Sequence, residues 1–334
     1  MLFYKIIFFT SLVTGSMISI SSNTWMGMWM GLEINLLSII PLMNNNKNIF
    51  ASEASMKYFV TQALASSIIM FSIIMMCKFK SFIWLNNSFM MTFNSALLTK
   101  MGTAPFHFWF PEVLEGLSWM NCLILLTWQK IAPMVLIMFN LSFPLFFSII
   151  IVTCMLVGGI MGFNQISMRK IMAYSSINHI GWMLAAMFFI NSIWTYYFII
   201  YSMISINLIF MLKILNIFFI KQLISINLNF VSKFLFIFNF MSLGGLPPFL
   251  GFMPKWMTIQ NLINSNHLFL SFSMIILTLI TLFYYMRVIY STLMFNTNQL
   301  NFQQKINFNS FSMISINFFS ILGLIICTNL FNFL

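Results

Sequence analysis

Four ionisable residues lie in stretches where an apolar chain normally has none. Glu33 is central in the run WMGLEINLLSIIP, and Lys130 is central in LLTWQKIAP. Lys100 comes two residues before a Gly/Pro-rich segment, and Lys255 follows a second such segment. A charged side chain in the middle of a bilayer costs roughly 2.5–3.5 kcal/mol on insertion scales, so residues retained there are functional candidates. Because burial disfavours the charged forms of Glu and Lys, both can exchange protons, and we interpret the four as a proton relay.

Four further residues are auxiliary candidates for the same path. His179 is central in SSINHIGW, and His107 lies inside the first Gly/Pro-rich segment; each is equally well explained as a hydrogen-bonded structural histidine. Lys57 forms a helical i,i+4 pair with Glu53, and Lys213 is deep in an apolar run. For all these charged residues the alternative is a structural ion pair, or a lysine that extends to the membrane interface.

The two Gly/Pro-rich segments repeat one pattern. Residues 102–111 read GTAPFHFWFP and residues 245–254 read GLPPFLGFMP, so both fit G-x-x-P-F-x-x-x-x-P at an offset of 143 residues. Proline removes a backbone hydrogen bond and clashes with the preceding turn, so both segments predict a broken helix. Such a break is tolerated in a membrane only where it is buried in protein or lines a wet cavity. The predicted breaks involve Gly102, Pro105, Pro111, Gly245, Pro248 and Pro254.

The composition requires a membrane around these segments. Only 6% of the 334 residues are charged and 61% are hydrophobic, whereas a soluble domain carries roughly 25% charged residues. The net charge of +11 comes from scattered Lys and Arg against four Glu, which is not a nucleic-acid-binding stripe. The four cysteines are far apart without a CxxC pair, so neither a zinc site nor an iron–sulfur cluster is expected. The sequence therefore predicts an all-α polytopic membrane protein without a bound metal.

Eleven apolar runs have the length of transmembrane helices, which need roughly 20 residues each. The expected ranges are 2–21, 25–43, 54–77, 87–110, 117–140, 143–163, 170–190, 193–217, 234–262, 267–294 and 311–333. The motifs fall in the fourth and ninth of these helices, five spans apart, so the two helices cross the membrane in opposite directions. Paired broken helices in inverted halves are typical of secondary transporters. We expect one membrane domain, 1–334, made of inverted repeats 1–140 and 143–295 and a C-terminal helix, 311–333.

Basic residues predict the orientation of this topology. Most loop lysines and arginines, including Lys5, Lys47 and the pair Arg169–Lys170, lie on or near the N-terminal side. Only Lys78 and Lys80 lie in loops on the other side. Since positive loops stay on the negative side of the membrane, we expect the N-terminus there and the C-terminus opposite.

Five blocks of sequence together resemble a known family. They are SEASMKYFVTQALASS (52–67), GTAPFHFWFPEVLEG (102–116), TWQKIAP (127–133), SSINHIGWM (175–183) and SLGGLPPFLGFMPKW (242–256). They look like the mitochondrial NADH–ubiquinone oxidoreductase chain 2 family, in its arthropod form, over nearly the whole chain. The resemblance implies an antiporter-like, proton-pumping subunit of respiratory complex I. It also implies that Glu33, Lys100, Lys130 and Lys255 match the proton route of the family.

The resemblance further implies a location, partners and cofactors. The location is the mitochondrial inner membrane, with the N-terminus in the matrix and the C-terminus in the intermembrane space. The partners are other complex I subunits, above all antiporter-like and small membrane subunits, together with lipids such as cardiolipin, and no nucleic acid. NADH, FMN, iron–sulfur clusters and ubiquinone are expected in other subunits, so this chain would bind no cofactor. From the residues alone, a cation/proton exchanger that acts by itself and a structural membrane scaffold remain alternatives.

Overall fold

The computed structural model describes residues 3–44, 48–79, 83–188, 191–225, 230–247 and 249–293. The expected helix 311–333 and the break residue Pro248 lie outside these ranges. Among the described residues, every regular element is a helix, apart from one isolated β-bridge between Ser167 and Phe219. The predicted all-α membrane fold is confirmed.

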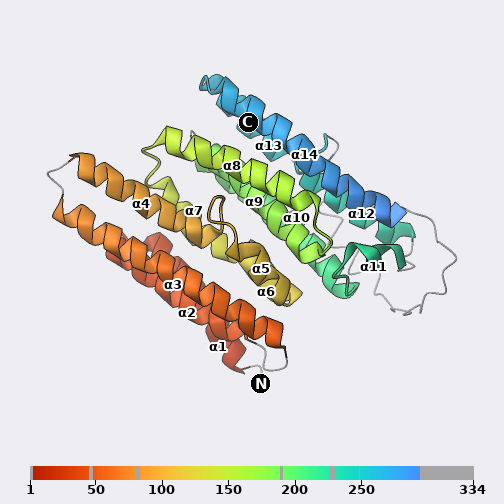
Figure 1. The fold of residues 1–334 in the computed structure, drawn as a ribbon, viewed down its shortest axis with the longest axis horizontal. Helices are drawn as coiled ribbons and strands as arrows, with labels where there is room; N and C mark the ends of the chain where they lie inside the picture. Colours follow the sequence, from red (N-terminus) through yellow and green to blue (C-terminus); the bar gives the residue numbers. More distant parts are fainter. Residues whose placement is uncertain are drawn as a thin grey trace. The chain divides into compact units, whose positions relative to one another are not determined.

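Fourteen helices form within the described residues (Figure 1). In chain order they are α1 (Phe3–Ser21), α2 (Trp25–Met43), α3 (Ile49–Lys78), α4 (Ile83–Met101), α5 (Trp109–Gly116), α6 (Trp119–Leu126), α7 (Trp128–Met138), α8 (Pro144–Phe163), α9 (Met168–Met187), α10 (Asn191–Ile214), α11 (Ile220–Ser225), α12 (Phe230–Gly244), α13 (Phe252–Asn264) and α14 (Leu268–Leu293).

Several of the described helices are long and apolar enough to cross a membrane. Seven stretches in the described part of the chain meet that criterion by length and composition, with α6 and α7 counted together. Three other expected spans do not meet it: α4, in 87–110, is long enough but too polar, 234–262 is divided by a break, and α9 carries Arg169, Lys170 and a polar centre.

The third helix begins at Ile49, five residues before the expected start at 54. Two polar residues, Ser52 and Glu53, are accommodated in its first turns. The Ser52 hydroxyl donates to the Ile49 carbonyl at 2.7 Å, and the Glu53 carboxylate pairs with Lys57 at 2.9 Å. Local side-chain bonds of this kind let polar residues occupy a helix start, so their presence did not mark the boundary.

Both predicted breaks are present, and a third occurs that the sequence analysis did not predict. The expected helix 87–110 is divided into α4 and α5, and the expected helix 234–262 is divided into α12 and α13. The expected helix 117–140 is divided at Thr127 into α6 and α7. Lys100 lies in the last turn of α4, and Lys130 and Lys255 lie in the first turns of α7 and α13, so each of the proposed relay lysines lies within one turn of a break.

The chain separates into two compact units, Met1–Ile150 (unit 1) and Ile151–Leu334 (unit 2). Within unit 1, α3 packs against α2, α4 and α5, and α7 packs against α1, α4 and α6. Within unit 2, α9 packs against α10 and α13, and α14 packs against α11, α12 and α13. The boundary between the two compact units falls inside α8, and the repeat boundaries at 140 and 143 stay a prediction. The inverted relation of the repeats 1–140 and 143–295 stays a prediction.

Candidate functional site

The first break begins with a helix cap that depends on glycine. Gly102 has a φ of +72°, and the N–H groups of Gly102 and Thr103 donate back to the carbonyls of Thr99 (3.1 Å) and Leu98 (3.2 Å). A side chain at Gly102 would be strained by this left-handed φ, and its Cβ would lie 2.9 Å from Cβ of Phe110. The helix therefore stops inside unit 1, and its last carbonyls are available to side chains.

The buried lysine Lys100 occupies the last turn of α4. Its side chain is buried, and the carboxylate of the half-buried Glu33 of α2 acts on it electrostatically. The C-terminal end of a helix carries a partial negative charge, so the ammonium is also favoured by its own helix. On α3, the Gln62 amide donates to the Lys100 backbone carbonyl at 3.3 Å. Glu33 of α2 is thus close enough to act on the charge of Lys100, and their joint role in a proton relay stays a prediction.

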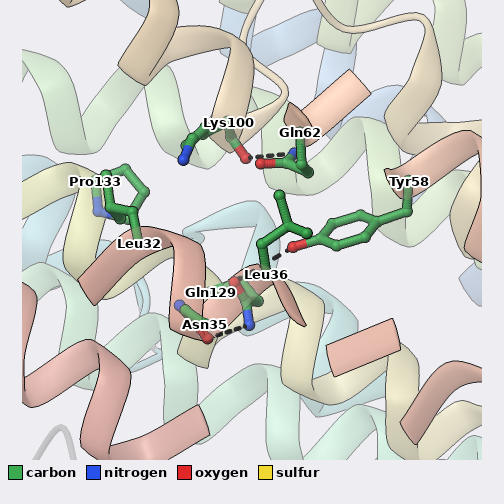
Figure 2. Close-up of a pocket in the computed structure, with 8 residues that line it drawn as sticks. All are labelled: Leu32, Asn35, Leu36, Tyr58, Gln62, Lys100, Gln129 and Pro133. Atoms are coloured by element: carbon green, nitrogen blue, oxygen red, sulfur yellow. Dashed lines mark hydrogen bonds between the residues drawn. The ribbon is translucent and has the colours of Figure 1, made fainter. Parts of the chain in front are cut away.

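A small polar cavity lies beside Lys100 (Figure 2). It is lined by Leu32, Asn35, Leu36, Tyr58, Gln62, Lys100, Gln129 and Pro133. Gln129 joins its walls, because its amide donates to Asn35 Oδ1 at 2.9 Å and accepts from the Tyr58 hydroxyl at 3.5 Å. The volume of about 10 Å³ open to the centre of a water-sized sphere is close to what one water molecule requires. A polar connection therefore leads from Lys100 to the residue that precedes Lys130.

Lys130 lies in the first turn of α7 and is the most deeply buried of the relay lysines. Lys100, Lys130 and Lys255 have exposed fractions of 8%, 1% and 6%. The Lys130 ammonium lies 5.9 Å from the centre of the Phe110 ring, within the range of a cation–π contact. Since Phe110 also covers Gly102, one aromatic ring connects Lys130 with the first break.

The break before Lys130 is centred on Thr127. Its hydroxyl donates to the Leu123 carbonyl at 2.7 Å, and its backbone, at φ −114° and ψ −71°, is distorted from ideal helix angles. A threonine that bonds to the carbonyl four residues earlier can bend a helix. This signal is weak in a sequence, because most threonines in helices do the same without a break.

The second break begins with the same cap as the first. Gly245 has a φ of +75°, and the N–H groups of Gly245 and Leu246 donate to the Met241 carbonyl at 3.0 and 3.3 Å. Lys255 reaches back from α13 across this break, and its ammonium donates to the carbonyls of Gly244 (2.9 Å) and Leu243 (3.3 Å). A Cβ on Gly245 would lie 2.8 Å from Cδ of Lys255, so this glycine also leaves room for the lysine.

Within unit 2, the contacts of the Lys255 ammonium are with an aromatic ring and backbone carbonyls. Its ammonium lies 5.8 Å from the centre of the Trp182 ring of α9. All four carboxylates of the sequence belong to residues 1–150, so no acidic residue of unit 2 can pair with this lysine. The charge of Lys255 is instead stabilised by the carbonyls at the end of α12.

The two auxiliary histidines are buried and hydrogen-bonded. His107 lies in the first break, with Nδ1 3.2 Å from the Pro105 carbonyl; because a carbonyl only accepts, Nδ1 carries the proton. His179 lies in α9, with Nδ1 2.9 Å from the Tyr197 hydroxyl. These contacts fit both the structural and the functional interpretation of the histidines.

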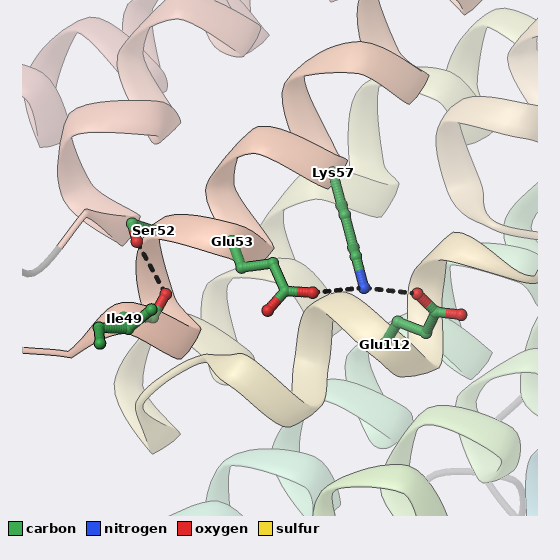
Figure 3. Close-up of polar contacts among 5 residues, drawn as sticks. All are labelled: Ile49, Ser52, Glu53, Lys57 and Glu112. Atoms are coloured by element: carbon green, nitrogen blue, oxygen red, sulfur yellow. Dashed lines mark hydrogen bonds and ion pairs between the residues drawn. The ribbon is translucent and has the colours of Figure 1, made fainter.

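The two auxiliary lysines lie on the surface of their units. Lys57 forms ion pairs at 2.9 Å with Glu53 of its own helix and with Glu112 of α5 (Figure 3). Lys213 is exposed near the end of α10. Neither is brought to the buried lysines, and the interhelical pair with Glu112 was not expected from the sequence.

The predicted break residues have different positions. Gly102 and Gly245 end the first half-helices, and Pro105 lies in the first break. Pro111 and Pro254 instead lie in the first turns of α5 and α13. A backbone N–H in a first turn has no partner within the helix, so proline loses nothing there. These prolines therefore help to begin α5 and α13 and do not interrupt α4 and α12.

The described part of the chain holds no group of three or more His, Cys, Asp or Glu side chains that could bind a metal ion. The expected lack of a cofactor stays a prediction. Buried lysines such as Lys100, Lys130 and Lys255 are groups that can accept and release protons.

Comparisons with known proteins agree with this architecture. The family model described as "NADH:quinone oxidoreductase/Mrp antiporter, TM" matches residues 22–281. The NADH-ubiquinone oxidoreductase chain 2 of Anopheles gambiae is 51% identical, with 97% of this chain and 97% of that chain covered. The chain 2 of Aedes aegypti is 50% identical, with 96% of each chain covered. A chain of respiratory complex I from Thermus thermophilus has a TM-score of 0.85 at 19% identity, covering 96% of this chain and 78% of that chain. A chain of the Mrp complex from Dietzia has a TM-score of 0.76 at 16% identity, covering 86% and 60%, and at such identities these two matches show the fold alone. The chain belongs to the NADH:quinone oxidoreductase/Mrp antiporter family, among the NADH–ubiquinone oxidoreductase chains 2.

Proposed function

We propose that this chain is an antiporter-like subunit of proton-translocating NADH:ubiquinone oxidoreductase in which Glu33, Lys100, Lys130 and Lys255 pass protons. The family and the relatives named chain 2 support the subunit. The observation that carries the proton path is the burial of the three lysines, each beside a helix end. A fixed charge is costly there, whereas a proton that comes and goes lets the site alternate between charged and neutral forms.

In unit 1 the carboxylate of Glu33 would control the charge of Lys100. While the carboxylate is near, the ammonium is favoured; when a change in a neighbouring subunit weakens that interaction, Lys100 releases a proton. One water in the cavity beside Lys100 would accept this proton and pass it toward Gln129 and Lys130. The Gln129 amide, held by Asn35 and Tyr58, would orient that water.

In unit 2 Lys255 would take and release protons without a carboxylate partner. The carbonyls of Leu243 and Gly244 favour its charged form, and release of the proton leaves a neutral amine that still donates to them. The redox steps would belong to other subunits, with NADH, FMN, iron–sulfur clusters and ubiquinone bound there.

The location and the partners follow from the family. A complex I subunit with several membrane-spanning helices resides in the mitochondrial inner membrane among other complex I subunits. Its N-terminus would lie in the matrix and its C-terminus in the intermembrane space, as the loop charges favour. Anionic lipids such as cardiolipin would lie against its exposed apolar helix faces.

The test is Lys130→Met in the intact complex reconstituted into vesicles. We expect assembly on native gels but fewer protons translocated per NADH oxidised, or a coupled turnover that is at least several-fold slower. Lys213→Met, an exposed lysine of α10, is the matched control and should behave as the wild type. Normal coupled pumping by the assembled Lys130 variant would contradict the proposal and favour a structural scaffold. Cation exchange against a pH gradient by the purified chain alone would favour an independent exchanger.

A further inference from the structure

Unit 2 contains a group of buried tyrosines that the proposed relay does not use. This tyrosine cluster consists of Tyr197 and Tyr201 of α10 and Tyr284 and Tyr285 of α14, all of them buried. Phenol hydroxyls are rarely placed in an apolar core without a partner, because an unsatisfied buried hydroxyl is unfavourable. Four of them beside one another call for an explanation.

Half of the tyrosine cluster surrounds the buried histidine of α9. The Tyr197 hydroxyl is 2.9 Å from Nδ1 of His179, and the Tyr201 ring centre is 5.1 Å from the His179 ring centre. The Tyr201 hydroxyl interacts with Ser176, one helical turn before His179. Tyr197 also interacts electrostatically with Tyr201 and Tyr285. The α10 tyrosines thus connect His179 with the tyrosines of α14.

The other half of the cluster continues along α14. The rings of Tyr284 and Tyr285 have centres 4.5 Å apart, and the Tyr285 hydroxyl interacts with the hydroxyls of Tyr284 and Ser175. Neither phenol oxygen has an aligned hydrogen-bond partner among the described residues. Buried hydroxyls on adjacent rings that are not aligned can form hydrogen bonds to one another by turning, or to an intervening water.

The cluster leads from the middle of unit 2 to one of its ends. His179 is 11 residues from the start of α9, about 16 Å along a helix. Tyr284 packs against Gly162 near the end of α8. A Cβ atom added to Gly162 would lie 3.1 Å from Cε1 of Tyr284. One turn further along α14, Arg287 donates to the Phe163 carbonyl at 2.8 Å. The tyrosine cluster therefore extends to the end of unit 2 at which α8 connects to α9.

The inner end of the cluster lies close to the proposed relay. Trp182, whose ring lies 5.8 Å from the Lys255 ammonium, is one turn after His179 on α9. Lys255, His179 and the tyrosine cluster therefore follow one another along α9 toward the α8–α9 connection.

We propose that the tyrosine cluster, with Ser175 and Ser176, is a proton path between His179 and the end of unit 2 that carries the α8–α9 connection. The inference rests on the proposed function, because a path is useful only if Lys255 exchanges protons. The Ser175 and Ser176 hydroxyls donate to the carbonyls of Met172 (2.8 Å) and Ala173 (2.7 Å) and must turn to take part. Each hydroxyl then gives its proton to the next oxygen as it receives one from the oxygen before it, so no group gains or loses a proton overall. At the inner end, the Tyr197 hydroxyl can donate to Nδ1 of neutral His179 or accept from it once Nδ1 is protonated.

The alternative is that these hydroxyls only join the helices, as polar side chains do in membrane proteins. Tyr→Phe substitutions separate the two roles, because phenylalanine keeps the ring and removes the oxygen. Both helices offer a matched control: Tyr196 of α10 and Tyr290 of α14 are 54% and 59% exposed and lie outside the cluster.

The experiment compares Tyr197→Phe and Tyr285→Phe with Tyr196→Phe and Tyr290→Phe in the intact complex in vesicles. Protons translocated per NADH oxidised, coupled turnover and the thermal stability of the assembled complex are measured. We expect the two cluster variants to assemble normally but to lose pumping or coupled turnover several-fold, while the two controls match the wild type. If one cluster variant fails to assemble, Tyr201→Phe takes its place.

Lys255→Met in the same series separates this inference from the proposed function. Wild-type pumping in both cluster variants together with impaired pumping in Lys255→Met would overturn the tyrosine path alone. Wild-type pumping in Lys255→Met as well would overturn the proposed function with it. Equal losses of thermal stability and pumping in the cluster variants would assign the tyrosines to helix packing and likewise overturn the path.

Discussion

The two broken helices, α4–α5 and α12–α13, have the same cap at the end of their first half. The lysine at the first cap, Lys100, precedes its break, whereas the lysine at the second cap, Lys255, follows its break. At the offset of 143 residues, Gly102 corresponds to Gly245, and both have a positive φ. The bond from Thr103 N–H to the Leu98 carbonyl corresponds to the bond from Leu246 N–H to the Met241 carbonyl. The cap that opens each break is therefore repeated at the same offset.

The charged residues are not repeated in the same way. The counterpart of Lys100 in the second motif is Leu243, and the counterpart of Lys255 in the first motif is Glu112. Lys255 nevertheless donates to the carbonyl of Leu243, and so reaches the position at which Lys100 itself lies in α4. Glu112 faces outward and pairs with Lys57. Each unit thus has an ammonium at the end of its half-helix, supplied by a different residue.

The partners of the two lysines differ in a way that bears on control. Lys100 lies under the influence of Glu33, whereas unit 2 has no carboxylate in its sequence and stabilises Lys255 with backbone carbonyls. A carboxylate on another helix can move or take up a proton, but the carbonyls of a helix end are fixed dipoles. We infer that the charge of Lys100 is controlled by Glu33. The charge of Lys255, by contrast, is stabilised to a constant extent by the fixed carbonyls.

The largest effect is expected from Gly245→Ala. The left-handed φ costs an alanine about 1–2 kcal/mol, and its Cβ would lie 2.8 Å from Cδ of Lys255. Both the cap and the lysine would be displaced, so we expect a less stable complex and little pumping, measured by thermal unfolding and by proton release in vesicles.

Gly102→Ala is the matched comparison, because its Cβ would meet Phe110 rather than Lys100. A similar loss of stability with a smaller loss of pumping is expected. Equal pumping defects in the two glycine variants would show that the contact with Lys255 is not what distinguishes the breaks.

An intermediate effect is expected from Glu33→Gln. Without the carboxylate, the charged form of Lys100 loses a stabilising neighbour, so coupled turnover should fall several-fold while the complex assembles. Assembly is measured on native gels and turnover as uncoupler-sensitive NADH oxidation. If Glu33→Gln pumps as the wild type does, Lys100 is not controlled by this carboxylate.

The smallest effect is expected from Glu112→Gln. It removes one of the two carboxylates that pair with Lys57, and an exposed ion pair contributes only about 0–1 kcal/mol. We expect at most a slight fall in the thermal midpoint and unchanged pumping. A strong pumping defect would mean that Glu112 keeps the role of its counterpart Lys255.

The sequence predicted both long breaks because their causes are local. A positive φ requires glycine and a helix interruption involves proline, and both residue types recur at one offset. The break at Thr127 was not predicted, because threonine is compatible with a continuous helix. Pro111 and Pro254 were expected to interrupt helices, but a proline in a first turn begins one.

The sequence predicted which lysines are buried, but not what they touch. The depth of Lys130 within an apolar run was sufficient to expect its burial. The pairing of Lys57 with Glu112, the contact of Lys255 with Leu243 and the tyrosine cluster join residues far apart in the chain. Such contacts depend on how the helices pack, so the spacing of these residues in the sequence does not predict them.

The most direct measurement is the number of protons translocated per NADH oxidised by the complex with Lys255→Met, and with Lys255→Met combined with Leu243→Lys. The double variant returns a lysine to the end of α12 at the position that Lys100 occupies in α4. We expect the single variant to assemble and to lose pumping, and the double variant to recover part of it. Full pumping by the assembled single variant would contradict the claim that a buried ammonium at this helix end passes protons.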